Sequence, residues 1–119
     1  MIVIKNRLDS HKQISPNFKA YELECHCRDC NISVVSEDLL NRLEILRRLW
    51  GKPVSLTSCY RCYLHNKAVG GKTHSWHLSG SAADIVFPDK DRSIFIKLCS
   101  KIFSYSYIED TFIHVDVRS

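Results

Sequence analysis

The sequence SWHLSGSAAD places a histidine and an aspartate where they could bind one ion. His77 stands just before a turn that contains glycine, and Asp84 lies on the apolar run that follows this turn. Near the end of the chain, residues 111–117 alternate in character, so that His114 and Asp116 share one face of a predicted strand. If the two strands pair, both histidines and Asp84 converge. Two imidazoles and one carboxylate form a ligand set of catalytic zinc sites, which leave a fourth position for water.

A zinc ion held by three protein ligands supplies hydrolytic chemistry. It lowers the pKa of a bound water to roughly 7 and polarises a carbonyl as a Lewis acid, which suits amide hydrolysis. Taken singly, a histidine or aspartate is more often a surface or capping group than a ligand. The remaining histidines are interpreted in that way: His11, His26, His65 and His74. The prediction therefore depends on the combination of His77, Asp84 and His114 with the glycine turn and the apolar strand face.

The sequence leaves two roles open for Asp116. Because it shares the strand face of His114, it can act as the general base that takes a proton from water. It can equally accept a hydrogen bond from a ligand imidazole and so orient that ring. Glu109 and Asp110, which lie shortly before the strand, are the alternative bases.

The six cysteines form a second candidate metal site. Two CxxC motifs supply four thiols: Cys27, Cys30, Cys59 and Cys62. Four thiolates of this kind can close a structural zinc site, with Cys25 and His26 as alternative ligands, although the spacing between the motifs is longer than usual. Buried, reduced thiols are the competing interpretation. Cys99 lies on the apolar side of a predicted helix and is assigned to the core.

Length and composition fit a single folded domain of 119 residues. Hydrophobic residues make up 45% and charged residues 25%, with few glycines and prolines, which excludes a disordered or collagen-like chain. The net charge of +4 is spread evenly and does not favour nucleic acid.

Neither a signal peptide nor a membrane span is expected, so we predict synthesis in the cytoplasm. In a chain without a signal, cysteines favour metal binding or free thiols over disulfides.

The elements that must position these residues follow from apolar periodicity. Helical spacing predicts helices over residues 36–50 and 91–103, the first with a serine and a glycine at its ends. A short helix at 20–23 and strands at 54–57, 82–87 and 111–117 complete the prediction. Residues 1–31 are otherwise expected to be an irregular, cysteine-rich segment that wraps a catalytic body of residues 32–119. The result is an α+β fold, a small antiparallel sheet with flanking helices.

Three stretches of the chain resemble the signature segments of the zinc-dependent D-alanyl-D-alanine carboxypeptidase-like peptidases. The stretches are TSCYRCYLHNKAVGG, SWHLSGSAADI and FIHVDVR, and the resemblance extends over about residues 18–118. It implies the zinc-binding fold that is also seen in the hedgehog signalling domain. It also implies that His77, Asp84 and His114 are the zinc ligands, the same trio that the strand pattern brings together.

The resemblance also assigns a role to Arg61. It implies that this guanidinium faces the substrate and holds a carbonyl oxygen or a terminal carboxylate. Asn66 fits the pattern as a residue that shapes the site. Relatives often carry an acid three residues before the last histidine, where this chain has Thr111. The proton-transfer group is therefore the part of the site that the resemblance does not supply.

From the residues and the resemblance together, we expect a monomeric zinc metallopeptidase that cuts peptidoglycan peptides. The expected reaction is that of a D-Ala-D-Ala carboxypeptidase or of a stem or cross-link endopeptidase, and the sequence does not decide between them. Compact enzymes of this kind resemble phage lysis proteins that act at the cell wall or in the periplasm. No nucleic-acid or membrane partner is expected. The alternatives are a non-catalytic zinc module of the same fold and a four-cysteine zinc-ribbon interaction domain.

Overall fold

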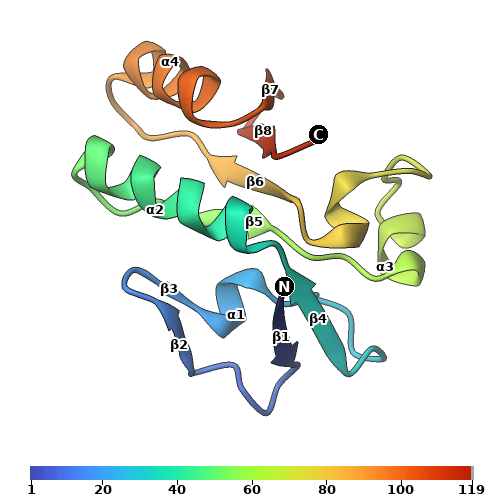
Figure 1. Ribbon diagram of the computed structural model, residues 1–119. Helices are drawn as coiled ribbons and strands as arrows, with labels where there is room; N and C mark the ends of the chain where they lie inside the picture. The colour runs from blue at the N-terminus through green and yellow to red at the C-terminus, as the bar shows by residue number, and fades with distance from the viewer. Residues whose placement is uncertain (119) are drawn as a thin grey trace.

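Two central strands of an antiparallel sheet bring the predicted ligands together. In the computed structural model, which describes residues 1–118, four strands are ordered β5-β6-β8-β7 (Figure 1). The strands are β5 (Leu56–Ser58), β6 (Ala82–Val86), β7 (Tyr105–Ile108) and β8 (Phe112–Asp116). Asp84 of β6 pairs directly with His114 of β8. The predicted pairing of these two segments is therefore confirmed.

Two helices cover the apolar face of this sheet (Figure 1). α2 (Glu37–Trp50) begins where the Ser36 hydroxyl accepts a hydrogen bond from the Leu39 N–H at 3.2 Å, and it ends at Gly51. α4 (Arg92–Ile102) packs beside α2. Buried side chains from both helices and from β6 and β8 form one core: Leu39, Leu43, Leu46, Phe95, Cys99, Ala83, Ile85, Ile113 and Val115. Both long helices and the core position of Cys99 are confirmed, and the structure is mixed α and β, with four α-helices in the described residues.

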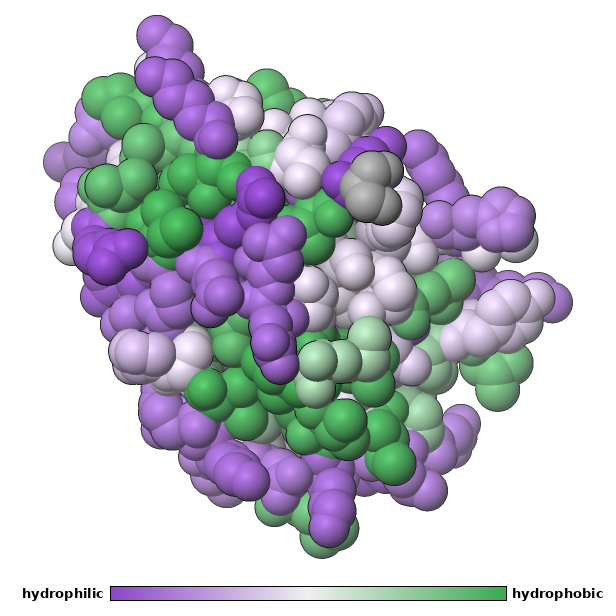
Figure 2. Space-filling view, viewed as in Figure 1, coloured by the Kyte–Doolittle hydropathy of each residue, from purple (hydrophilic) through white to green (hydrophobic). Residues whose placement is uncertain are grey.

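The N-terminal part contains paired strands, which corrects the expectation that residues 1–31 are irregular. The elements are β1 (Ile2–Lys5), β2 (Gln13–Ser15), β3 (Phe18–Lys19), α1 (Ala20–Leu23) and β4 (Ile32–Val35). β1 pairs with β4 and β2 pairs with β3, both antiparallel. Figure 2 shows apolar side chains gathered over the β1–β4 pair, where Met1, Val3 and Ile32 are exposed. The sequence predicted the short helix but not these strands, because each is short and its pairing is a tertiary contact.

The turn that carries His77 is docked on the start of α2. α3 (Tyr63–Ala68) and the 3-10 helix η1 (Trp76–Ser79) lie between β5 and β6 in the chain. Gly80 ends η1 with a φ of 71°, and its carbonyl accepts a hydrogen bond from the Ser36 N–H at 3.0 Å. A side chain at Gly80 would collide with the backbone of β4, so glycine allows this close approach. Among residues 1–118, no helix combines the length and apolar character needed to cross a bilayer.

Candidate metal centre

His77, Asp84 and His114 meet on the face of the sheet opposite the core. His77 comes from η1, and the other two residues come from the paired strands β6 and β8. The Nε2 atom of His77 and the Nδ1 atom of His114 each lie 3.2 Å from Oδ1 of Asp84. One ligand atom from each residue lies within 4.8 Å of the other two, and all three residues are buried. The structure thus brings the predicted trio to one point.

In each imidazole, one nitrogen faces Asp84 and is called the inner nitrogen. The other, outer nitrogen contacts a group that can only accept a hydrogen bond. Nδ1 of His77 lies 2.6 Å from the carbonyl oxygen of Cys59, and Nε2 of His114 lies 2.8 Å from Oδ2 of Asp116. A neutral imidazole has one N–H, which these acceptors draw to the outer nitrogen. In this tautomer both inner nitrogens offer lone pairs to an ion bound between them and Asp84; without an ion, an inner N–H can instead hydrogen-bond to Oδ1 of Asp84. Three converging lone pairs fit a bound cation, and this donor set is one that zinc prefers.

The carboxylate of Asp84 is kept charged although it is buried. Its Oδ2 atom accepts a hydrogen bond from Nη2 of Arg61 at 2.9 Å. Burial alone would raise the pKa of Asp84, but the imidazole contacts and the positive charge of Arg61 outweigh it and hold this pKa well below its usual range. Arg61 also donates to the Ser58 hydroxyl at 2.9 Å and to Oδ1 of Asn66 at 3.3 Å. The guanidinium is therefore held rigidly beside the candidate ligand.

Asp116 is enclosed behind His114 rather than exposed beside it. Its side chain is fully buried and lies outside the cleft at the trio. Both of its oxygens accept hydrogen bonds from the Arg118 guanidinium, at 2.8 and 2.7 Å, and Oδ2 also contacts His114. Burial would raise the pKa of Asp116, but these bonds lower it, so the group is a carboxylate. Asp116 is therefore placed to orient the imidazole ring of His114.

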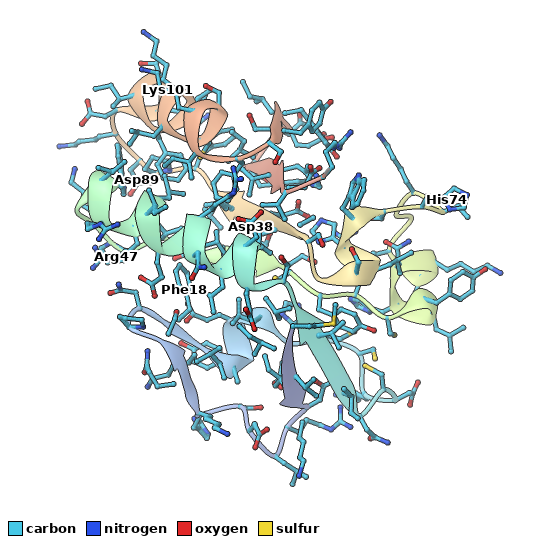
Figure 3. The ribbon with its side chains drawn as sticks, in the orientation of Figure 1. Phe18, Asp38, Arg47, His74, Asp89 and Lys101 are labelled. Atoms are coloured by element: carbon cyan, nitrogen blue, oxygen red, sulfur yellow. The ribbon has the colours of Figure 1, made fainter. Side chains whose placement is uncertain are left out.

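An open cleft of about 440 Å³ leads to the trio. Arg61 and Glu109 lie on its walls, and His74 lies on the loop at the outer edge of the molecule in Figure 3. The Tyr107 ring stacks on the His114 ring, with the centroids 4.7 Å apart. Burial, followed by the negative charges of Asp84 and Glu109, raises the pKa of Tyr107, so its hydroxyl stays protonated at neutral pH. A substrate can reach the trio through this cleft.

Tyr107 is a cleft residue that the sequence analysis missed. It lies on β7 and pairs directly with His114 of β8. The only signal in the sequence is the alternation of Tyr105 and Tyr107 in the segment YSYI, which is consistent with two tyrosines on one strand face. Four residues are too few for this alternation to predict a strand, so the sequence does not connect Tyr107 to the site.

The cysteines that cluster differ from the predicted set in one member. Sulfur atoms within 4.8 Å of one another come from Cys25, Cys27, Cys30 and Cys62, which we call the thiolate cluster. The predicted ligand Cys59 lies elsewhere, because the backbone after β5 directs its side chain into the core, where burial raises its pKa to about 12. Cys59 contacts the histidine site through its backbone carbonyl, which lies beside Nδ1 of His77, and not through its thiol. The prediction of Cys59 as a metal ligand is therefore wrong, and the alternative ligand Cys25 takes its place.

Comparison with protein families matches most of this chain. A family model described as Peptidase M15 matches residues 16–116. The match begins just after β2 and runs to the end of β8, so it includes η1, β6 and every residue of the histidine and aspartate trio. A search of curated proteins found no match.

Proposed function

This chain belongs to the peptidase M15 family, and from that membership we propose that it is a zinc-dependent peptidase acting on peptidoglycan peptides. The observation that carries the proposal is the convergence of three ligand atoms at an open cleft. A structural zinc site closes with four protein ligands, whereas three leave one position for water or substrate. We further propose that the fold is of the DD-peptidase and hedgehog type and that residues 1–119 act as a single domain.

His77, Asp84 and His114 would hold the zinc ion. Bound there, zinc supplies Lewis-acid chemistry, which activates water and polarises the scissile carbonyl. The residues around the trio then have separate tasks. Arg61 keeps Asp84 ionised and presents its guanidinium to the cleft, where it can hold a carbonyl oxygen or a terminal carboxylate. The rings of Tyr107 and Trp76 line the same cleft and offer apolar surface to the peptide.

Proton transfer is assigned to Glu109, and orientation of the ligand ring to Asp116. Glu109 is exposed on the cleft wall, where it can exchange a proton with water and pass it to the leaving amine. Asp116 is fully buried and is hydrogen-bonded by Arg118 and His114. Its carboxylate fixes the proton on the outer nitrogen of His114, which leaves the inner nitrogen free for the ion.

Asp116→Asn and Glu109→Gln should give opposite patterns of metal binding and turnover. We expect Asp116→Asn to weaken zinc affinity by about 10- to 100-fold while kcat recovers at saturating zinc, because the ring loses its carboxylate partner. Glu109→Gln should retain zinc affinity and lose about 100-fold in kcat. Zinc titration against a competing chelator and peptidase assays at saturating zinc measure both. Unchanged zinc affinity with a low kcat in Asp116→Asn would instead make Asp116 the base.

Digestion of purified peptidoglycan tests the proposed function directly. The zinc-loaded protein should release products that mass spectrometry of the muropeptides identifies, and chelator-treated protein should release none until zinc is restored. Release of D-alanine indicates a carboxypeptidase, whereas cleaved stem or cross-link peptides indicate an endopeptidase. Zinc-loaded protein that leaves every muropeptide intact would contradict the proposal and favour the non-catalytic zinc module.

The cellular setting is proposed by analogy with phage lysis enzymes. On this analogy, the chain is made in the cytoplasm and reaches the cell wall or periplasm by other means. We propose that it acts there as a monomer, with peptidoglycan peptides as its partner and without nucleic acid or membrane.

A further inference from the structure

The thiolate cluster joins two segments that are distant in the sequence. Cys25, Cys27 and Cys30 lie on the loop between α1 and β4, and Cys62 is the N-cap residue of α3. Figure 3 shows yellow sulfur atoms below α3, beside the loop that leads into β4. The Cys27 sulfur lies 3.1 Å from that of Cys30 and 3.6 Å from that of Cys62. All six cysteines of the chain are free thiols in this structure.

These distances fit one tetrahedral ion. With a zinc–sulfur bond of about 2.3 Å, the edge of a regular tetrahedron of sulfurs is about 3.8 Å. The sulfurs of the cluster all lie within 4.8 Å of one another, and the Cys27–Cys30 and Cys27–Cys62 separations of 3.1 and 3.6 Å are shorter than that edge. Outward movement of the Cys27 and Cys30 side chains would therefore widen the cluster to the size of a tetrahedral site.

Every sulfur of the cluster also accepts an N–H hydrogen bond. Three donors are backbone groups: Cys62 N–H to Cys25, Cys30 N–H to Cys27 and His65 N–H to Cys62, each at 3.4 Å. The fourth donor is the side-chain amide of Asn6, 3.2 Å from the Cys30 sulfur. Asn6 is buried and is itself oriented by the Ser33 hydroxyl. Hydrogen bonds of this kind stabilise the negative charge of metal-bound thiolates and orient them.

We propose that the thiolate cluster binds one structural zinc ion, separate from the ion of the histidine site. Four sulfur ligands leave no open position, so this ion has no part in hydrolysis. Synthesis in the reducing cytoplasm, which we predict for this chain, would keep the thiols available until the ion binds. The proposal does not depend on the peptidase activity, because it rests on a different set of residues.

An ion in the thiolate cluster would also help to position Arg61 at the cleft. Arg61 directly precedes Cys62, and its own N–H donates to the His77 carbonyl at 3.1 Å. Tyr60, one residue earlier, donates its N–H to the Leu23 carbonyl at the end of α1. An ion on Cys62 would therefore fix the short segment that carries the guanidinium, and tie it to the loop after α1. By joining these two segments, zinc binding would also stabilise the folded chain.

Metal content separates the two sites. We expect two zinc ions per chain in the wild type, one in Cys27→Ser, and one in His77→Ala. Cys99→Ala is the matched control, because it removes a buried thiol outside the cluster and should keep both ions. Cys27→His should also keep both, since three thiolates and an imidazole still bind zinc. A zinc content that is the same in Cys27→Ser as in the wild type would overturn the proposal, whereas a single wild-type zinc that Cys27→Ser loses would count only against the histidine site.

Cobalt substitution tests the proposal without relying on a variant that could fail to fold. Wild-type protein loaded with Co²⁺ should show thiolate-to-cobalt charge-transfer absorption, and His77→Ala should retain it in full. Wild-type protein that binds cobalt without this absorption would contradict the thiolate site. An intact mass lower by two hydrogens, with two thiols lost to titration, would reveal a disulfide in the cluster and overturn the zinc site. Loss of peptidase activity in His77→Ala with the absorption retained keeps the two proposals apart.

Discussion

We expect His114→Ala to lower kcat/KM on peptidoglycan peptides by about 1000-fold or more. The substitution removes the Nδ1 ligand that lies 3.2 Å from Asp84 and also leaves the buried Asp116 without its imidazole partner. Loss of the ion forfeits transition-state stabilisation of about 4 kcal/mol, which corresponds to the 1000-fold change. Muropeptide mass spectrometry and zinc analysis of the same preparations measure both effects.

His11→Ala provides the control for this experiment. His11 is exposed on the N-terminal part of the chain and lies outside the cleft, so its removal should leave both rate and zinc content unchanged. Wild-type kcat/KM in His114→Ala would show that hydrolysis does not use the histidine site. Equal loss of activity in both variants would point to a general effect of histidine removal instead.

The second large effect is expected at Arg61. We predict that Arg61→Lys lowers kcat/KM by about 100- to 1000-fold while zinc content stays unchanged. The guanidinium reaches Asp84, Ser58 and Asn66 at the same time, and a lysine ammonium cannot reproduce that planar set of donors although it keeps the charge. The zinc ligands themselves are untouched. Steady-state kinetics and metal analysis check the two parts of the prediction.

Arg48→Lys is the matched substitution on the opposite side of the protein's core. Arg48 is exposed on α2 and does not line the cleft, so the same chemical change should have no effect on turnover. Full activity in Arg61→Lys would remove the guanidinium from the mechanism. Loss of zinc in that variant would assign Arg61 to ion retention through Asp84 rather than to the substrate.

Strand alternation made the histidine site predictable. Ile113 and Val115 had to face the core, so His114 had to face away, and pairing with the apolar run around Asp84 placed two ligands opposite each other. His77 followed because it lies just before the turn that enters that run. These are local signals, which a single sequence contains.

The errors arose where tertiary packing decides the outcome. The CxxC spacing gave no information on which way Cys59 points, and the bend after β5 turns its side chain into the core. β1 and β4 are recognisable only as a pair, because neither segment is long enough to signal a strand alone. The close docking of Gly80 on β4 likewise depends on the folded backbone. None of these features has a periodic signature.

The two histidine rings are supported by acceptors of different origin. The partner of His77 is the carbonyl of Cys59, which belongs to the main chain, whereas the partner of His114 is the side chain of Asp116. A mutation at residue 59 changes a thiol and leaves the carbonyl, but a mutation at residue 116 changes the acceptor itself. Natural or laboratory selection can therefore adjust the affinity for the ion by changing the codon of residue 116. The hydrogen bond to His77 stays the same in such variants, because its acceptor is a backbone carbonyl.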